Sequence, residues 1–171
     1  MASDNVAYLA MSLDGFLAGP DGSVSFLDDF ASDDYGFHDF VAEVGALAMG
    51  STTYEQVLGV GWPYGTLPTL VLTSRDLPKA EGADITFSSE PTGDAIRSFA
   101  ETTDGRLWIV GGGKVVADGL NAGAIDTLEL YVMPLLLGGG TPIAAEAFDG
   151  LLTLRESNAF SNGVVKLTYA T

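Results

Sequence analysis

The sequence predicts a single α/β domain over residues 1–171, with a mostly parallel mixed central sheet and antiparallel strands at its C-terminal end. Short apolar runs alternate with stretches of helical spacing over residues 5–120, and such alternation favours a parallel sheet. Residues 151–169 instead hold two strand-like stretches around Ser161-Asn162-Gly163, a pattern typical of a hairpin. The length suits one domain with a substantial core.

The N-terminal part is predicted to contain a buried strand, a long loop and a helix. The continuous apolar run at residues 5–12 is typical of a strand buried on both faces. Residues 14–29 are rich in Gly, Asp and Pro and predict a long loop, a candidate lid. Three polar residues at 32–34 precede apolar residues at helical spacing, which predicts a helix over residues 34–44.

The later elements follow from the same two periodicities. We expect strands over residues 46–49, 69–73, 85–87, 106–110 and 127–133. We expect one helix that is capped by Ser51, Thr52 and Thr53, and two further helices over residues 93–102 and 114–120. A glycine-rich loop over residues 134–141 and hairpin strands over residues 151–160 and 164–169 complete the chain.

Composition excludes several functional classes. The 7 Lys and Arg residues stand against 23 Asp and Glu residues, a formal net charge of −16. Nucleic acids and anionic membranes need a basic surface, so we expect neither as a partner. Small molecules or protein partners remain, and we expect a small-molecule substrate. The chain has no Cys and a single histidine, His38, which excludes a disulfide framework, a Cys nucleophile and a multi-His or Cys-rich metal site.

The chain is expected to be cytoplasmic. Its N-terminus lacks the basic segment of a secretory signal. The longest uncharged stretches, residues 59–74 and 130–145, are interrupted by Pro and Gly and are shorter than the roughly 20 apolar residues of a membrane helix. The absence of Cys is compatible with a reducing compartment.

The glycines at residues 111–113 are the strongest candidate for a phosphate site. They end a buried strand and open a helix at Lys114, where backbone N–H groups point outward and absent side chains let a pyrophosphate approach. The spacing differs from the dinucleotide-binding G-x-G-x-x-G pattern. A tight strand-to-helix turn would explain the same glycines.

Two further features fit anion binding. The junction at residues 50–53 places hydroxyls at the positive end of a helix, although Ser and Thr are also ordinary helix caps. Arg75 follows a predicted strand and is one of few cations in the chain. Its guanidinium group is suited to binding a phosphate. The alternative is that Arg75 is an ordinary surface arginine in a turn.

Six segments, taken in order, carry a resemblance to a known family. They are residues 6–11, 12–18, 48–55, 72–75, 108–113 and 130–140. Together they resemble the dihydrofolate reductase superfamily, and within it the branch similar to the C-terminal reductase domain of the bifunctional riboflavin-biosynthesis deaminase/reductase. The resemblance covers almost the whole chain and implies a dihydrofolate-reductase-like three-layer fold.

The resemblance implies an NADPH-dependent reductase that transfers hydride to a pyrimidine-like or pteridine-like heterocycle, similar to the 5-amino-6-(5-phosphoribosylamino)uracil reductase of riboflavin biosynthesis. It implies a homodimer formed through the C-terminal strands and a cis bond between Gly111 and Gly112. The implied cofactor contacts are Ala10, Leu17 and Ile109 at the nicotinamide, Gly50, Ser51, Thr52, Thr53, Thr73, Ser74 and Arg75 at the adenosine phosphates, and Gly111, Gly112, Gly113, Lys114 and Val115 at the pyrophosphate.

Two departures from the family pattern affect specificity. Ser51 stands where family members often carry an Arg that contacts the 2′-phosphate, so the implied NADPH preference depends on Arg75 taking that role. Phe16 replaces a Lys of riboflavin-pathway reductases, and no cluster of basic residues precedes the first helix. A phosphorylated ribosyl substrate is therefore in doubt, because a buried phosphate needs cations.

The substrate side rests on one carboxylate and several aromatic residues. An alignment with dihydrofolate reductases places Asp34 where a carboxylate supports protonation of the pterin, and a helix cap is the alternative that we favour. We assign His38 no catalytic role. Four aromatic residues are expected to line the binding site of a flat heterocycle: Phe26, Phe30, Phe37 and Tyr131. The alternative is that these side chains belong to the hydrophobic core.

Two other functions stay open at this point. A true dihydrofolate reductase would use Asp34 and bind methotrexate. A non-catalytic nucleotide-binding module would bind the cofactor without turnover.

Overall fold

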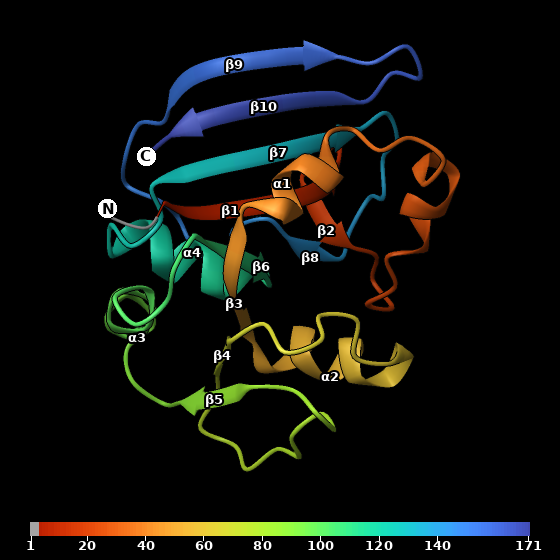
Figure 1. Ribbon diagram of the computed structural model, residues 1–171. Helices are drawn as coiled ribbons and strands as arrows, with labels where there is room; N and C mark the ends of the chain where they lie inside the picture. Colours follow the sequence, from red (N-terminus) through yellow and green to blue (C-terminus); the bar gives the residue numbers. More distant parts are fainter. Residues whose placement is uncertain (1–3) are drawn as a thin grey trace.

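An eight-stranded mixed sheet forms the centre of the computed structural model, which describes residues 4–171 (Figure 1). The strand order is β5-β4-β3-β6-β1-β7-β10-β9. The first six strands of that order are parallel, whereas β10 runs antiparallel to both β7 and β9. The strands are β1 (Asn5–Ser12), β3 (Val44–Gly50), β4 (Thr69–Leu72), β5 (Ile85–Ser88), β6 (Arg106–Gly111), β7 (Thr127–Met133), β9 (Thr153–Ala159) and β10 (Val165–Ala170).

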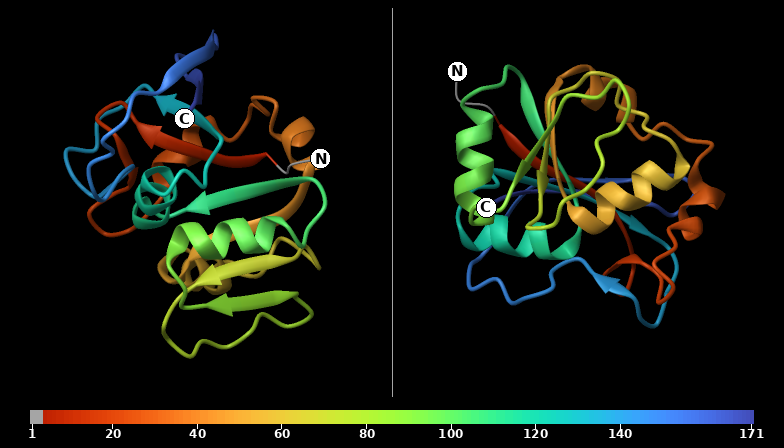
Figure 2. Two further views of the ribbon diagram at one scale, coloured as in Figure 1. Left: turned by 90° about the vertical axis from the view of Figure 1, so that its left-hand side faces the viewer. Right: turned by 90° about the horizontal axis from the view of Figure 1, so that it is seen from below.

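Helices cover both faces of this sheet and make three layers (Figure 2). Successive residues of a strand point to opposite faces, so β6 sends Ile109 to one face and Trp108 to the other. The Ile109 face packs against α3 (Thr92–Ala100) and α4 (Gly113–Asn121), and the Trp108 face packs against α1 (Phe37–Ala42) and α2 (Ser51–Val60). The predicted α/β class, with antiparallel C-terminal strands, is confirmed.

The loop over residues 14–29 contains structure that the sequence did not indicate. It holds the short strand β2 (Phe16–Ala18), which pairs with β8 (Thr141–Pro142), and a 3₁₀ helix at Ser25–Phe30. A Cβ added to Gly140 would lie 2.0 Å from the Ala18 carbonyl oxygen, so only glycine fits at this crossing. The loop is thereby held against the segment that follows β7.

The helix expected over residues 34–44 is shorter, and this prediction is corrected. α1 begins at Phe37 and ends at Ala42, and its N-cap is Gly36 rather than Asp34. Tyr35 and Gly36 have φ values of 54° and 85°, in the left-handed region, which a right-handed helix cannot include.

The hydroxyl residues after β3 are also placed differently from the prediction. Gly50 is the N-cap of α2, and no side chain caps this helix. Ser51, Thr52 and Thr53 therefore form the first helical turn instead of capping it.

Other sequence predictions agree closely with the structure. β1 and β7 have the predicted bounds, and the C-terminal hairpin turns at residues 160–164, where the Phe160 N–H donates to the Val164 carbonyl oxygen at 2.9 Å. Over residues 4–171 no helix is both long and apolar enough to cross a bilayer. The homodimer through the C-terminal strands stays a prediction.

Candidate active site

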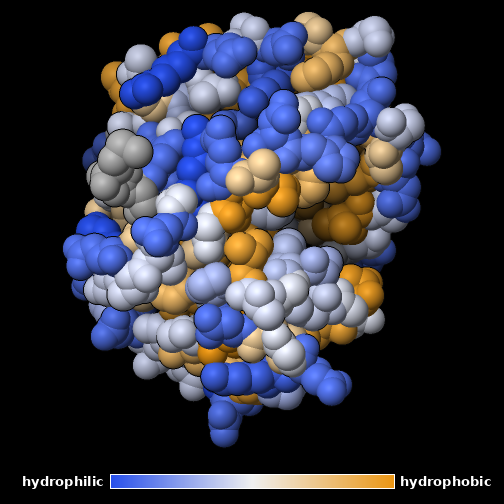
Figure 3. Space-filling model, viewed as in Figure 1, coloured by the Kyte–Doolittle hydropathy of each residue, from blue (hydrophilic) through white to orange (hydrophobic). Residues whose placement is uncertain are grey.

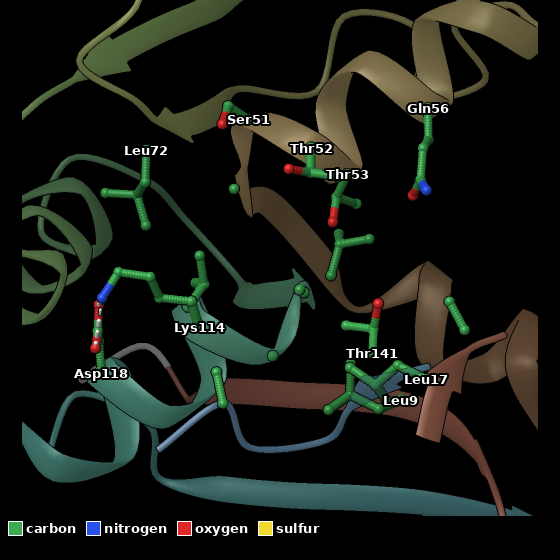
Figure 4. A pocket seen from close by; sticks show the side chains of 18 of the residues that line it. Leu9, Leu17, Ser51, Thr52, Thr53, Gln56, Leu72, Lys114, Asp118 and Thr141 are labelled. Atoms are coloured by element: carbon green, nitrogen blue, oxygen red, sulfur yellow. Dashed lines mark hydrogen bonds and ion pairs between the residues drawn. The ribbon is translucent and has the colours of Figure 1, made fainter. Parts of the chain in front are cut away.

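A cleft of about 740 Å³ opens where β1, β3 and β6 end (Figure 4). The beginnings of α2 and α4 line it from opposite sides, and residues of the 14–29 loop border it. Ligands of open α/β sheets bind outside the carboxyl ends of the strands. The position of the cleft therefore matches the general rule for a nucleotide site.

Two helix N-termini converge on this cleft without side-chain caps. Gly50 precedes α2 and Gly112 precedes α4, both with extended backbone, and no side-chain hydrogen bond caps either helix. The first turn of a helix leaves backbone N–H groups without intrahelical partners and carries a partial positive charge. These two helix ends can hold two phosphate groups of one ligand.

The three glycines at the start of α4 have different roles. A Cβ on Gly113 would lie 2.3 Å from the Pro142 carbonyl oxygen, so the packing of the 142–145 segment excludes any side chain there. A Cβ on Gly112 would meet only Thr53 Oγ1, at 3.6 Å across the cleft. The bond between Gly111 and Gly112 is cis, as the resemblance implied. Close packing against the 142–145 segment thus explains Gly113, whereas Gly112 leaves room for a ligand.

The polar lining of the cleft is hydroxyl-rich, and its one cation is already paired. Among the lining residues that the structure describes, Lys114 is the single cation, and its Nζ lies 3.0 Å from Asp118 Oδ2 (Figure 4). The hydrogen bond and charge of Asp118 raise the pKa of Lys114. The serine and threonine residues that line the cleft are Ser51, Thr52, Thr53, Ser74, Ser89, Thr92 and Thr141.

Most of the cofactor contacts expected from the sequence line this cleft. They are Ala10, Leu17, Gly50, Ser51, Thr52, Thr53, Ser74, Gly111, Gly112, Gly113, Lys114 and Val115.

Three expected contacts lie outside the cleft lining. Ile109 is fully buried in the core on the α3 and α4 face, and its neighbour Val110 lines the cleft instead. Thr73 Oγ1 accepts a hydrogen bond from the Arg75 backbone N–H at 3.0 Å and closes a local turn. The Arg75 guanidinium is engaged with Glu55.

Sequence reasoning missed several lining residues. Gln56 is the most informative, because its Nε2 donates to the Gly22 carbonyl oxygen at 3.1 Å and so connects α2 to the 14–29 loop. The sequence offered one signal for Gln56: it lies four residues after Thr52, and residues four apart share one face of a helix. Glu90 and Asp118 also line the cleft, and they come from sequence positions that no motif marked.

A second cavity, of about 540 Å³, adjoins the first. Tyr8, Ala10 and Leu27 line both cavities. Figure 3 shows apolar surface at a hollow beside α1, bordered by polar surface. Residues that line the second cavity there include Phe30 and Phe37. The two cavities thus meet where the resemblance places the reactive end of a cofactor.

Three of the four aromatic residues expected at the substrate line this second cavity. They are Phe30, Phe37 and Tyr131. Phe26 instead packs against the buried cluster of Tyr131, Met133 and Val164, so the structure places it in the supporting core. Tyr8, which the sequence did not mark, lies 4.8 Å from Tyr131 between ring centroids.

Asp34 lines the second cavity and also holds the turn before α1. Its Oδ2 accepts from the Gly36 backbone N–H at 3.1 Å, and its Oδ1 accepts from the His38 backbone N–H at 3.2 Å and contacts His38 Nδ1. Desolvation raises the pKa of Asp34, but the hydrogen bonds and charge of His38 outweigh it and lower the pKa below its ordinary value. The carboxylate is therefore ionised at neutral pH.

Tyr8 and Tyr131 are two of the hydroxyl-bearing residues that line the same cavity. The Tyr131 hydroxyl donates to the Tyr35 carbonyl oxygen at 3.1 Å. Burial, followed by hydrogen bonding and charge at Tyr131, raises the pKa of Tyr8, so Tyr8 stays protonated at neutral pH. The cavity therefore combines a carboxylate acceptor with phenol groups and aromatic walls.

The chain matches known proteins along nearly its whole length. The family model described as the RibD C-terminal domain matches residues 6–166. An uncharacterized Bacillus subtilis (strain 168) protein, YwjB, is 33% identical over 168 residues, covering 96% of this chain and 96% of its own.

Solved structures share the fold. A protein from Shewanella sp. PV-4, with a provisional assignment to riboflavin biosynthesis, has a TM-score of 0.81 at 26% identity and covers 98% of each chain. The Thermotoga maritima deaminase/5-amino-6-(5-phosphoribosylamino)uracil reductase has a TM-score of 0.71 at 14% identity over 99% of this chain and 56% of its own. The Enterococcus faecalis dihydrofolate reductase, complexed with NADP(H), has a TM-score of 0.67 at 19% identity over 99% and 97%. The fold is dihydrofolate-reductase-like, as the resemblance implied.

Proposed function

The chain belongs to the RibD C-terminal domain family, and on that premise we propose that it is an NADPH-dependent reductase acting on a pyrimidine-like or pteridine-like heterocycle. One observation carries the proposal: a cleft with two uncapped helix N-termini joins an aromatic-walled cavity at Tyr8, Ala10 and Leu27. A dinucleotide and a heterocycle could therefore lie in contact.

The cleft supports the cofactor half of this proposal. The N-terminal turns of α2 and α4 would bind the phosphates, and the open face of Gly112 would let them approach. Ala10 and Leu17 would border the nicotinamide ring. When bound, NADPH supplies the hydride, and the chain contributes binding, orientation and exclusion of water.

The second cavity supports a substrate without a phosphate group. Its lining, as far as the structure describes it, includes Asp33 and Asp34 but no Lys or Arg. Bringing a phosphate into such surroundings would be costly, because no Lys or Arg of the described lining compensates its charge. We infer a neutral or cationic heterocycle whose N–H groups face the acidic side. This differs from the phosphoribosylated substrate named for the Thermotoga maritima enzyme.

Asp34 would accept hydrogen bonds from that heterocycle. Because its carboxylate is ionised at neutral pH, it would stabilise the positive charge that develops when a ring nitrogen gains a proton during hydride transfer. Aromatic rings at Phe30 and Phe37 would stack beside the heterocycle and keep its plane fixed.

Titration with NADPH and NADH, followed by quenching of tryptophan fluorescence, tests the cofactor site. We expect micromolar binding, weakened at least tenfold by Gly112→Asp, which places a carboxylate between the two helix ends. Gly59→Asp is the matched control, because a Cβ there meets nothing within 4 Å. Binding of neither nucleotide by the wild-type protein would exclude the reductase.

A true dihydrofolate reductase is the second candidate, because Asp34 does line the cavity beside Ala10. Turnover of dihydrofolate and binding of methotrexate would favour it. Cofactor binding without turnover of any heterocycle would instead favour a nucleotide-binding module.

A further inference from the structure

We propose that Glu55 sets the cofactor preference of the cleft by competing with the 2′-phosphate of NADPH for the guanidinium of Arg75. The inference rests on the proposed function, since it concerns the adenosine end of the same cofactor site. It assigns a role to a carboxylate that lines neither cavity.

The pair is bidentate and joins α2 to the loop that follows β4. Arg75 Nη1 lies 3.1 Å from Glu55 Oε1, and Arg75 Nη2 lies 2.6 Å from Glu55 Oε2. Glu55 is in α2, one turn after Ser51, and Arg75 follows directly after Ser74. Both Ser51 and Ser74 line the cleft. The ion pair therefore joins two segments that each contribute a serine to the cleft lining.

Among the cleft-lining residues that the structure describes, no cation is unpaired and available to the 2′-phosphate. Among the described lining residues Lys114 is paired with Asp118, and Glu90 adds a further negative charge to the lining. A 2′-phosphate would need an arginine or lysine, whereas a 2′-hydroxyl can bond to serine hydroxyls or to a carboxylate. Apart from Lys114, Arg75 is the cation of the described chain that directly follows a lining residue, Ser74. The choice between NADPH and NADH therefore depends on whether Arg75 is released.

Release is energetically accessible. The side chains of Arg75 and Glu55 are 53% and 44% exposed, and an exposed ion pair shifts an equilibrium by at most about fivefold. A phosphate with two negative charges competes well against one carboxylate for the same donors. The wild-type protein should therefore bind NADPH only a few-fold more weakly than it would without the competition.

Neutralising Glu55 tests the proposal directly. With Glu55→Gln, we expect the Kd for NADPH to fall about two- to fivefold, while the Kd for NADH stays unchanged. With Arg75→Gln, we expect the Kd for NADPH to rise and the Kd for NADH to stay unchanged. The double variant should bind NADPH as Arg75→Gln does, because Glu55 acts only through the guanidinium.

Asp94→Asn is the matched control for charge. It removes one carboxylate from another exposed ion pair, in which Arg97 Nη2 lies 2.8 Å from Asp94 Oδ1 in α3. It should leave the NADPH/NADH affinity ratio at the wild-type value. Thermal unfolding of each variant checks that the fold is intact.

The outcomes distinguish a failure of the proposed function from a failure of this inference. If the wild-type protein binds neither nucleotide, the proposed function fails and this inference with it. If both nucleotides bind but Glu55→Gln leaves the affinity ratio unchanged, only this inference is overturned. The inference is also overturned if Glu55→Gln strengthens the binding of both nucleotides equally, or if it still strengthens NADPH binding in the Arg75→Gln background. In either case the loss of one negative charge near the cleft would explain the effect without Arg75.

Discussion

The Asp14 carboxylate accepts a hydrogen bond from the Gly138 backbone N–H at 2.7 Å and so joins the loop after β1 to the loop after β7. The same carboxylate accepts from the Leu137 N–H at 3.0 Å and from the Ser12 hydroxyl at 2.6 Å. These two loops carry β2 and β8, which pair beside the cleft. One side chain therefore holds together the border of the candidate site.

Asp14→Asn should destabilise the protein at neutral pH but have less effect in acid. The Ser12 hydroxyl and the two backbone N–H donors lower the pKa of Asp14 to about 2, from 3.8. A lowered folded-state pKa contributes stability that is present above pH 3.8 and is lost as the pH falls toward 2. Melting temperatures of both proteins between pH 7 and pH 3 check this. A difference that is constant with pH would contradict it.

Gly113→Ala should both destabilise the fold and weaken nucleotide binding. Its Cβ would lie 2.3 Å from the Pro142 carbonyl oxygen, so either α4 or the 142–145 segment must move. We expect a loss of about 1–3 kcal/mol in the free energy of unfolding, typical of overpacking, measured by urea denaturation.

Gly59→Ala is the matched control for that variant. Gly59 lies within α2, and a Cβ there meets no atom within 4 Å. Alanine should stabilise this helix by about 0.5–1 kcal/mol. Equal effects of the two substitutions would argue against the packing at Gly113.

Asp34→Asn should weaken binding of 2,4-diaminopyrimidine, a heterocycle with N–H donors, in the presence of NADPH. The variant keeps the shape of the side chain but loses the ionised acceptor, and a hydrogen bond to a charged group is worth about 1.5–3 kcal/mol. We expect an affinity loss of roughly 10- to 150-fold by isothermal titration calorimetry. Asp33→Asn is the control, because Asp33 Oδ2 is engaged with Asn162 Nδ2 at 2.9 Å. A larger loss for Asp33→Asn would move the substrate contact there.

Local patterns in the sequence were sufficient for the order of the elements. The apolar runs gave the bounds of β1 and β7, and the short polar turn at residues 161–163 indicated the hairpin. The glycines at residues 111–113 marked the junction where the cleft lies. These features depend on neighbours a few residues apart, which a single sequence displays directly.

Features that depend on contacts across the fold were outside the reach of these patterns. Tyr35 is left-handed where a helix was expected, and its carbonyl oxygen accepts from Tyr131, which is distant in sequence. Ile109 faces the core because the alternation of β6 turns Val110 to the cleft. No periodicity indicates which member of such a pair meets the ligand.

The sequence by itself determined the α/β class, the family and the two strand-to-helix junctions, because glycines, hydroxyls and hydrophobic periodicity act locally. Only the tertiary structure showed how the charges pair. Arg75 and Glu55 are 20 residues apart in the sequence and form a bidentate ion pair that no local pattern indicates. Whether a cation is free for a phosphate depends on distances between side chains, and these exist only once the chain has folded.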